Sequence, residues 1–294
     1  MTRAARADVR SVPLDMDDEE FARFQALIRD KAGIALAPHK RALVVARLYR
    51  RLGALGLATY RGYLARVWAD PDELVTMLDC VCTNETSFFR EPQQFSFLEQ
   101  AVFPGWRRGR PRRLRAWSAA CSTGEEAYSL AMVLHDQFPA DEGWRFDVVA
   151  TDLSTRAVAV ARAATWHLRA AADIPDDYLR RYMLRGGAGA DGRVQARAEL
   201  RAAVHCARLN LVDERYAVGG FFDLIFCRNV LMYFDAATRV QVLTRLLARL
   251  APDGYLHLGH AESVRCLPAI RDRVRCVAPA VYVHAGFHAD GRSR

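Results

Sequence analysis

From Leu114 onward, short apolar runs rich in β-prone residues alternate with helical stretches, and this alternation constrains the fold more than any other feature of the chain. Each run is nearly continuously apolar, which is typical of strands buried on both faces of a parallel sheet. The expected strands are 114–119, 146–151, 204–209, 222–227 and 255–258. Helices are expected among them at 125–138, 154–164 and 236–250. The pattern predicts an α/β fold with a doubly wound sheet.

The end of the chain and one insertion depart from this alternation. The runs 274–277 and 280–284 flank Pro279 and predict a closing antiparallel hairpin. Residues 167–200 hold an expected helix from Asp176 to Leu184 and then a Gly-rich loop at 186–192. The spacing of this insertion allows a small β-flap, and a disordered surface loop is the alternative.

The first part of the chain is helical in pattern and has no strand signal. Helices are expected at 17–32, 39–52, 59–68 and 71–78, with Gly33 and Gly53 as stops and Asp70 as a cap before Pro71. We therefore expect a flexible N-terminus at 1–16, a small all-α domain at 17–82, and a linker with a connecting helix at 83–113. An α/β domain follows at 114–294, with its insertion at about 167–200.

Composition limits the number of domains, the cellular location and the kind of partner that we expect. The 294 residues are 51% hydrophobic, which is enough for one large domain and a small one. No apolar run approaches the ~20 residues that span a bilayer, and the Arg-rich N-terminus is not followed by an apolar stretch. We therefore expect a cytoplasmic protein without membrane insertion. The net charge of +8 suggests an acidic partner, which composition alone does not identify.

Two strand ends carry features of a nucleotide-like site. Residues 117–126 lead from a strand through small residues and one glycine into a helix, so the backbone can approach a ligand and the helix offers unpaired N–H groups. A plain tight turn is the alternative, because one glycine is a poor dinucleotide fingerprint. Asp152 ends the next strand, where it can accept ribose hydroxyls or instead cap the 154–164 helix. A ligand with a ribose and no phosphate, such as S-adenosylmethionine, suits both segments.

Two further polar segments lie where a ligand could bind. Arg228 and Asn229 directly follow the 222–227 strand, at the crevice where open α/β sheets bind ligands, and Tyr233 follows one turn later. Helix capping by Asn229 is the alternative. The second segment, 83–90, combines polar residues with two aromatics and Arg90 between the helical part and the sheet. It could close over a cofactor, or it could be a hydrophobic hinge with a solvated arginine.

These segments resemble the CheR-type chemoreceptor glutamate methyltransferases. The strongest matches are 83–91, 117–128, 222–235 and 252–262, and the resemblance extends from the helical part to Tyr282. It implies an all-α domain joined to a class I methyltransferase domain with a small β-subdomain and a C-terminal antiparallel hairpin. Two departures are Ala261, where the family often has serine, and Met232, where an aliphatic residue is usual. The Gly-rich loop matches in length but not in detail, so the resemblance does not establish that a receptor tail docks there.

The resemblance also implies roles for individual residues. It assigns S-adenosylmethionine, and the product S-adenosylhomocysteine, to the sheet domain and implies no metal site. The implied cofactor contacts are Asn84, Thr86, Arg90, Glu126 (with Glu125 as the alternative), Asp152, Asn210, Leu211, Arg228 and Asn229. Arg90 and Tyr233 correspond to the pair beside the transferred methyl group. The implied substrate is a glutamate side chain in the cytoplasmic helical domain of a methyl-accepting chemoreceptor.

A basic stripe in the second helix is the candidate docking surface. Lys40, Arg47 and Arg51 fall on one side of this helix, and Arg50 is close by. A solvated helix face is the alternative, and the resemblance favours docking on an acidic receptor bundle. We expect the protein to act as a monomer and not on nucleic acid. The competing functions are a nucleic-acid methyltransferase and a non-catalytic cofactor-binding regulator.

Overall fold

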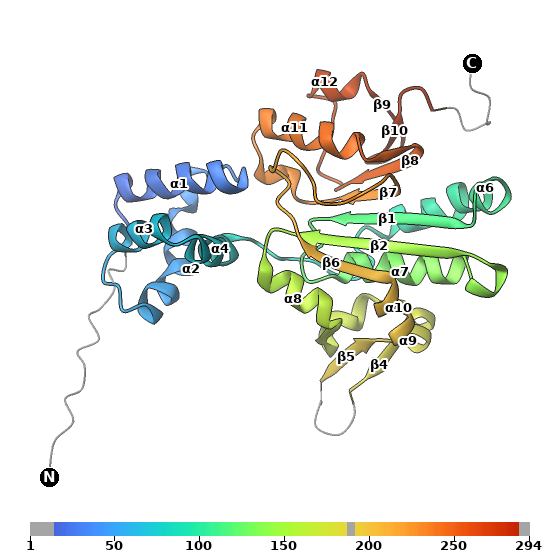
Figure 1. Ribbon diagram of the computed structural model, residues 1–294, viewed down its shortest axis with the longest axis horizontal. Helices are drawn as coiled ribbons and strands as arrows, with labels where there is room; N and C mark the ends of the chain where they lie inside the picture. Colours follow the sequence, from blue (N-terminus) through green and yellow to red (C-terminus); the bar gives the residue numbers. More distant parts are fainter. Residues whose placement is uncertain (1–14, 187–191, 288–294) are drawn as a thin grey trace, which may run out of the picture. The chain divides into compact units, whose positions relative to one another are not determined.

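The computed structural model describes residues 15–186 and 192–287, and the chain divides into two compact units, 1–83 and 84–294 (Figure 1). Most of the expected flexible segment 1–16, and most of the Gly-rich loop 186–192, lie outside the described residues. None of the helices in the described ranges combines the length and apolar character that a bilayer span needs.

The first unit is all-α. Its elements are α1 (Asp18–Ala32), the 3₁₀ helix η1 (Pro38–Lys40), α2 (Arg41–Ala54), α3 (Tyr60–Ala69) and α4 (Pro71–Val81). Asp17 forms a capping box with Glu20, and Gly33 ends α1 in the left-handed conformation at φ 70°. Gly53 does not end α2 as expected, because the helix continues to Ala54. The last helix runs to Val81, three residues beyond its expected end.

The second unit contains a seven-stranded sheet in the order β6-β2-β1-β7-β8-β10-β9. The first five strands are parallel, and β10 is antiparallel to both of its neighbours. The strands are β1 (Arg113–Ala119), β2 (Arg145–Asp152), β6 (Val204–Arg208), β7 (Phe222–Cys227), β8 (Leu250–Leu258), β9 (Val274–Ala278) and β10 (Val281–His284). This arrangement confirms the expected class I methyltransferase fold with its C-terminal hairpin.

Helices surround this sheet and connect its strands. They are α5 (Pro92–Phe97), η2 (Leu98–Val102, a π-helical turn), α6 (Phe103–Gly109), α7 (Glu125–Gln137), η3 (Ala140–Glu142), α8 (Thr155–Ala163), η4 (Leu168–Asp173), α9 (Asp176–Tyr182), α10 (Ala198–Ala203), η5 (Leu231–Tyr233), α11 (Ala236–Leu247) and α12 (Pro268–Arg271). Helix α7 packs on β1 and β2, α8 packs on β2 and β6, and α11 packs on β8. Helix α11 ends three residues before its expected end, because Leu250 already pairs with Phe222 as the first residue of β8.

The insertion forms a second, antiparallel sheet in the order β3-β5-β4, which confirms the β-subdomain. Its strands are β3 (Thr165–His167), β4 (Met183–Arg185) and β5 (Arg193–Ala196). The expected helix is shorter than predicted, because Met183 and Leu184 pair with β5 and so belong to a strand. The labelled strands β4 and β5 lie beyond the β6 edge of the large sheet, and the β9–β10 hairpin lies at the other end (Figure 1).

Large aromatic side chains fill the core of the sheet domain. Trp117 of β1 is fully buried between Tyr216 and Phe222, and its indole N–H donates to the Thr151 hydroxyl at 2.9 Å. A buried indole needs such a partner for its N–H group. This packing holds β1, β2 and β7 together directly below the loops at their carboxyl ends.

Candidate active site

Strained backbone marks the edge of the sheet where β1 and β7 end. Ala120 (φ 70°) and Ser122 (φ 51°) follow β1, and Asn229 (φ 58°) follows β7. Left-handed conformations are costly for residues other than glycine and tend to persist at functional sites. Since β2, β1 and β7 are adjacent and parallel, their carboxyl ends lie at this same edge. The strain therefore points to this edge as a binding site.

Asp152, at the end of β2, holds the loop that follows β1. Its Oδ2 atom accepts a hydrogen bond from the Ser122 N–H at 2.8 Å, and Oδ1 accepts from the Ser154 N–H at 2.9 Å. Helix α8 is capped by Ser154, whose hydroxyl accepts from the Ala157 N–H, so the capping alternative for Asp152 is wrong. A carboxylate has about four acceptor sites.

The turn between β1 and α7 packs closely against α8. Gly124 has φ 101° and sits at the start of α7, where an added Cβ would lie 2.8 Å from the Cβ of Ala161. The close approach of this turn to α8 thus requires glycine. The two interpretations of residues 117–126, a tight turn and an open backbone beside a ligand, are therefore compatible.

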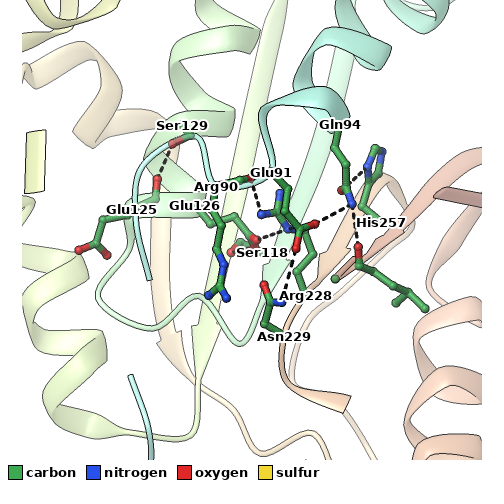
Figure 2. A network of polar contacts seen from close by, with 12 residues as sticks. Arg90, Glu91, Gln94, Ser118, Glu125, Glu126, Ser129, Arg228, Asn229 and His257 are labelled. Atoms are coloured by element: carbon green, nitrogen blue, oxygen red, sulfur yellow. Dashed lines mark hydrogen bonds and ion pairs between the residues drawn. The ribbon is translucent and has the colours of Figure 1, made fainter. Parts of the chain in front are cut away.

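Glu126 belongs to a buried polar cluster around Arg228 (Figure 2). One carboxylate oxygen of Glu126 accepts from the Ser118 hydroxyl at 2.6 Å, and the other lies 3.4 Å from Arg228 Nε. Glu125, in contrast, points away from this cluster and accepts from the Thr123 hydroxyl at 2.6 Å. Of the adjacent pair of glutamates, Glu126 is the one that lies with Arg228 and Arg90.

The charges in this cluster are poorly solvated. Burial raises the pKa of Glu126 above its ordinary value, while the Arg228 guanidinium acts in the opposite direction. The Arg228 side chain is 1% exposed, and its Nε and Nη1 atoms have no hydrogen-bond partner among the described residues. A ligand that brought an ammonium to Glu126 would stabilise the charged carboxylate. The cluster therefore suits a zwitterionic group such as the amino acid end of S-adenosylmethionine.

The linker before α5 is tied to the sheet domain by backbone contacts. The Ser122 hydroxyl donates to the Asn84 carbonyl at 3.0 Å, and the Phe89 N–H donates to the Ser129 hydroxyl at 2.9 Å. Both aromatic residues of the linker, Phe88 and Phe89, are buried, whereas Arg90 is exposed. The burial of these two aromatic side chains agrees with the interpretation of segment 83–90 as a hydrophobic hinge. Asn84 and Thr86 are half-buried on the same linker.

Arg90 sits on a strained turn beside the polar cluster. Phe89 and Glu91 on either side have φ 48° and 56°, and the Arg228 guanidinium donates to the Arg90 carbonyl. The Arg90 guanidinium donates to the Glu85 carbonyl at 3.2 Å. The backbone of Arg90 is therefore held firmly, while its side chain remains accessible to a ligand.

After β7, Asn229 precedes a single 3₁₀ turn, η5, and Tyr233 is the last residue of that turn. The N-caps of η5 and α11 are Val230 and Asp235, so Asn229 does not cap a helix. Its side-chain amide faces Glu91 Oε1 at 3.5 Å. Tyr233 is half-buried, and its hydroxyl makes no hydrogen bond within the described residues. These residues share the sheet edge with Asp152 and Glu126.

Asn210 and Leu211 follow β6, one strand beyond Asp152 in the sheet. The Asn210 side chain accepts from the Val212 N–H at 3.3 Å, and the Tyr216 hydroxyl donates to the Leu211 carbonyl at 2.8 Å. Leu211 is buried. The loop after β6 is thus well ordered by its own contacts and extends the site along the sheet edge.

The structure divides the expected docking stripe into two parts. Arg47 donates to the Val81 carbonyl and the Thr83 hydroxyl, and Arg51 makes a bidentate ion pair with the buried Glu73. The Arg51 guanidinium lowers the pKa of that carboxyl. Lys40 and Arg50 are exposed and make no ion pair within the described part of the chain. Only these two members of the stripe are available to a partner.

Sequence reasoning gave no role to several polar residues of the site. Glu91 accepts from the His260 N–H at 3.0 Å and from the Gln94 amide at 3.1 Å, and Gln94 also contacts His257 Nδ1 at 3.0 Å. Burial lowers the pKa of His257 well below its ordinary value, so its imidazole is neutral. Glu262 is a further polar residue of the site that had no assigned role, and its carboxylate accepts from the backbone N–H groups of Asn229 and Gly259. Glu91 and Glu262 lie in motif segments, but nothing in the spacing showed which distant loops they would contact.

Comparison with known proteins identifies the family of the chain. Residues 84–278 match the family model described as the CheR methyltransferase SAM-binding domain, and residues 19–82 match the CheR methyltransferase all-alpha domain. The chain is 40% identical over 252 residues to chemotaxis protein methyltransferases of Salmonella typhimurium and Escherichia coli, covering 85% of this chain and 85% and 86% of theirs. It is 34% identical to chemotaxis protein methyltransferase Cher2 of Pseudomonas putida, covering 90% of this chain and 97% of that protein.

Proposed function

Because the chain belongs to the CheR methyltransferase family, we propose that it methylates glutamate side chains of a methyl-accepting chemoreceptor in the cytoplasm, with S-adenosylmethionine as the donor. The observation that carries this proposal is the sheet edge at which Asp152 and the Glu126–Arg228 cluster lie beside strained loops. This edge offers an acceptor for ribose hydroxyls and a charged cluster for an amino acid group.

In this proposal, different residues of the edge bind different parts of the cofactor. Asp152 accepts from the ribose hydroxyls, Glu126 receives the ammonium, and Arg90 faces the carboxylate and sulfonium end together with Asn84 and Thr86. Asn210 and Leu211 line the adenine side, and Arg228 and Asn229 contribute from the end of β7. When bound, S-adenosylmethionine supplies an electrophilic methyl group.

The chemistry requires alignment more than proton transfer. A glutamate carboxylate has a reference pKa of about 4.3, so it is already a nucleophilic anion at neutral pH and needs no general base. The protein must orient the carboxylate oxygen toward the methyl carbon and exclude water from the anion. Tyr233 orients the incoming carboxylate through its hydroxyl, and Arg90 positions the reacting groups without neutralising the nucleophile.

The chemical stability of the product tests this function. Purified protein is incubated with methyl-labelled S-adenosylmethionine and either a chemoreceptor cytoplasmic domain or total RNA. Label should enter the receptor domain and should be released as methanol by mild alkali, because carboxyl methyl esters are alkali-labile. Alkali-stable label on protein would indicate an amine target, label in RNA would indicate a nucleic-acid methyltransferase, and no transfer to either would indicate a non-catalytic regulator.

Docking of the receptor is proposed to involve the exposed part of the basic stripe, Lys40 and Arg50. The proposal takes the helical bundle of the chemoreceptor to present an acidic surface. The net charge of +8 on this chain is complementary to such a surface. Arg47 and Arg51 serve the helical unit itself, Arg47 through its hydrogen bonds to Val81 and Thr83 and Arg51 through its ion pair with Glu73. Removing Arg51 would leave the buried Glu73 charge without this partner, which destabilises a fold. Reversing their charges would therefore destabilise this unit, so the result would not report on docking alone.

Reversing the charge of both exposed residues, Lys40→Glu with Arg50→Glu, should raise the KM for the receptor domain about three- to tenfold and leave the affinity for S-adenosylmethionine unchanged. The effect should shrink as salt is added, because exposed charges are screened beyond ~8 Å at physiological ionic strength. Steady-state kinetics at low and high salt measure it. Reversal of the exposed Arg66 on α3, which pairs with Asp70, is the matched control. Equal KM values for the two proteins at low salt would make the stripe an ordinary solvated face.

A further inference from the structure

The carboxylate of Glu262 joins the loops that follow β7 and β8. Its Oε2 atom accepts from the backbone N–H groups of Gly259 at 2.8 Å and Asn229 at 2.9 Å, and its Oε1 atom accepts from the Met232 N–H at 3.3 Å. The residue is 7% exposed. A buried carboxylate that accepts several backbone N–H groups makes strong bonds of defined geometry.

These three bonds fix parts of the proposed active site. The bond to Asn229 holds a residue in the left-handed conformation, at φ 58°. The bond to Met232 holds the middle residue of η5, the turn that carries Tyr233. The two loops approach each other so closely that a Cβ at Gly259 would lie 2.8 Å from the backbone nitrogen of Asn229 and 2.7 Å from its side-chain Nδ2. Glu262 thus connects the placement of Asn229 with that of Tyr233.

We propose that Glu262 is a positioning residue for methyl transfer, one that sets the orientation of the Tyr233 hydroxyl through the backbone of η5. It contacts none of the reacting groups, so its effect passes through Met232 and Asn229. The inference rests on the proposed function, because it concerns the rate of that same transfer.

Asp223 provides a matched control at the opposite end of β7. Its carboxylate accepts from the Arg115 N–H at 2.7 Å and pairs with Arg110, so it also joins neighbouring segments. It lies at the amino end of the strand, away from the strand ends that carry the site. Changing Asp223 to asparagine therefore removes a comparable carboxylate without affecting the loops at the carboxyl edge.

Glu262→Gln is the informative variant. The glutamine oxygen can still accept from Asn229 and Gly259, but its NH₂ group faces the Met232 N–H and offers no acceptor there. The single-turnover rate of transfer to a receptor cytoplasmic domain, at saturating S-adenosylmethionine, should fall about tenfold, since small misplacements at a reacting centre can cost up to ~100-fold. Asp223→Asn should stay within about twofold of the wild type. Glu262→Asp, which shortens the reach by one methylene, is a second variant expected to behave like Glu262→Gln.

A double-mutant cycle separates positioning from general support of the fold. In a Tyr233→Phe background the hydroxyl is already absent, so Glu262→Gln should lower the rate by less than about twofold more. The same fold-reduction in both backgrounds would overturn the inference, as would equal rates for Glu262→Gln and Asp223→Asn. Absence of transfer by the wild-type protein would overturn the proposed function itself, whereas a normal wild-type rate with unaffected Glu262 variants would overturn only this inference.

Discussion

Replacing Asp152 with alanine should weaken the binding of S-adenosylmethionine by about ten- to a hundredfold. Hydrogen bonds to a charged group contribute roughly 1.5–3 kcal/mol, and each 1.4 kcal/mol is about a tenfold change in affinity. The substitution removes the proposed acceptor of the ribose hydroxyls. It also releases the Ser122 N–H, which Asp152 holds at 2.8 Å, so the loop after β1 should lose its fixed conformation as well.

Titration calorimetry with S-adenosylmethionine measures this loss, and two further variants assign it. Asp152→Asn keeps one acceptor oxygen and should bind more tightly than the alanine variant. Ser154→Ala removes the cap of α8 beside the same loop but no proposed ribose contact, so its affinity should stay near that of the wild type. Unchanged affinity in a folded Asp152→Ala protein would exclude Asp152 from the site. A loss of equal size in Ser154→Ala would assign the effect to loop conformation.

The part of this site that sequence could predict is the part determined by local structure. Asp152 ends an apolar run, and Arg228 and Asn229 directly follow another, so their places at the carboxyl edge follow from the strand pattern and the parallel sheet. The same pattern predicted the sheet and the closing hairpin. The errors in secondary structure fell at the ends of elements, where pairing between strands decides which residues belong to a strand. Leu250 was expected to end a helix, but it pairs with Phe222 and therefore belongs to β8.

What could not be predicted depends on contacts between distant segments. Glu125 and Glu126 are adjacent acidic residues in the sequence, and contacts made in the fold distinguish them, above all the one between Glu126 and the distant Arg228. A helical projection likewise placed Arg51 on an outward stripe, but Glu73 of α4 packs against it. Periodicity tells which residues share a helix face, and it does not tell which neighbouring helix covers that face.

Replacing Arg90 with alanine should lower the single-turnover rate of methyl transfer about a hundredfold. The side chain is exposed and, among the residues that the structure describes, makes one hydrogen bond, to the Glu85 carbonyl. Its removal should therefore cost little folding stability, and the lost rate reports on function. The backbone turn should persist, since the Phe89 N–H bond to Ser129 and the Arg228 bond to the Arg90 carbonyl do not involve the Arg90 side chain. Arg90→Lys keeps the charge but loses the planar fork of donors, and it should recover only part of the rate.

Tyr233→Phe keeps the ring and removes only the hydroxyl, and its effect should be smaller, about tenfold on kcat. The affinity for S-adenosylmethionine should stay close to that of the wild type, because an interaction made mainly in the transition state lowers kcat without weakening cofactor binding. If Arg90 and Tyr233 hold the same reacting centre, the double variant should lose less than the product of the two single effects. Single-turnover rates of the four proteins, with cofactor affinity measured separately, complete this cycle. Strictly multiplicative losses would mean that the two groups act independently, and a normal rate for Tyr233→Phe would leave that tyrosine as a wall of the pocket and assign the alignment to Arg90 and the backbone.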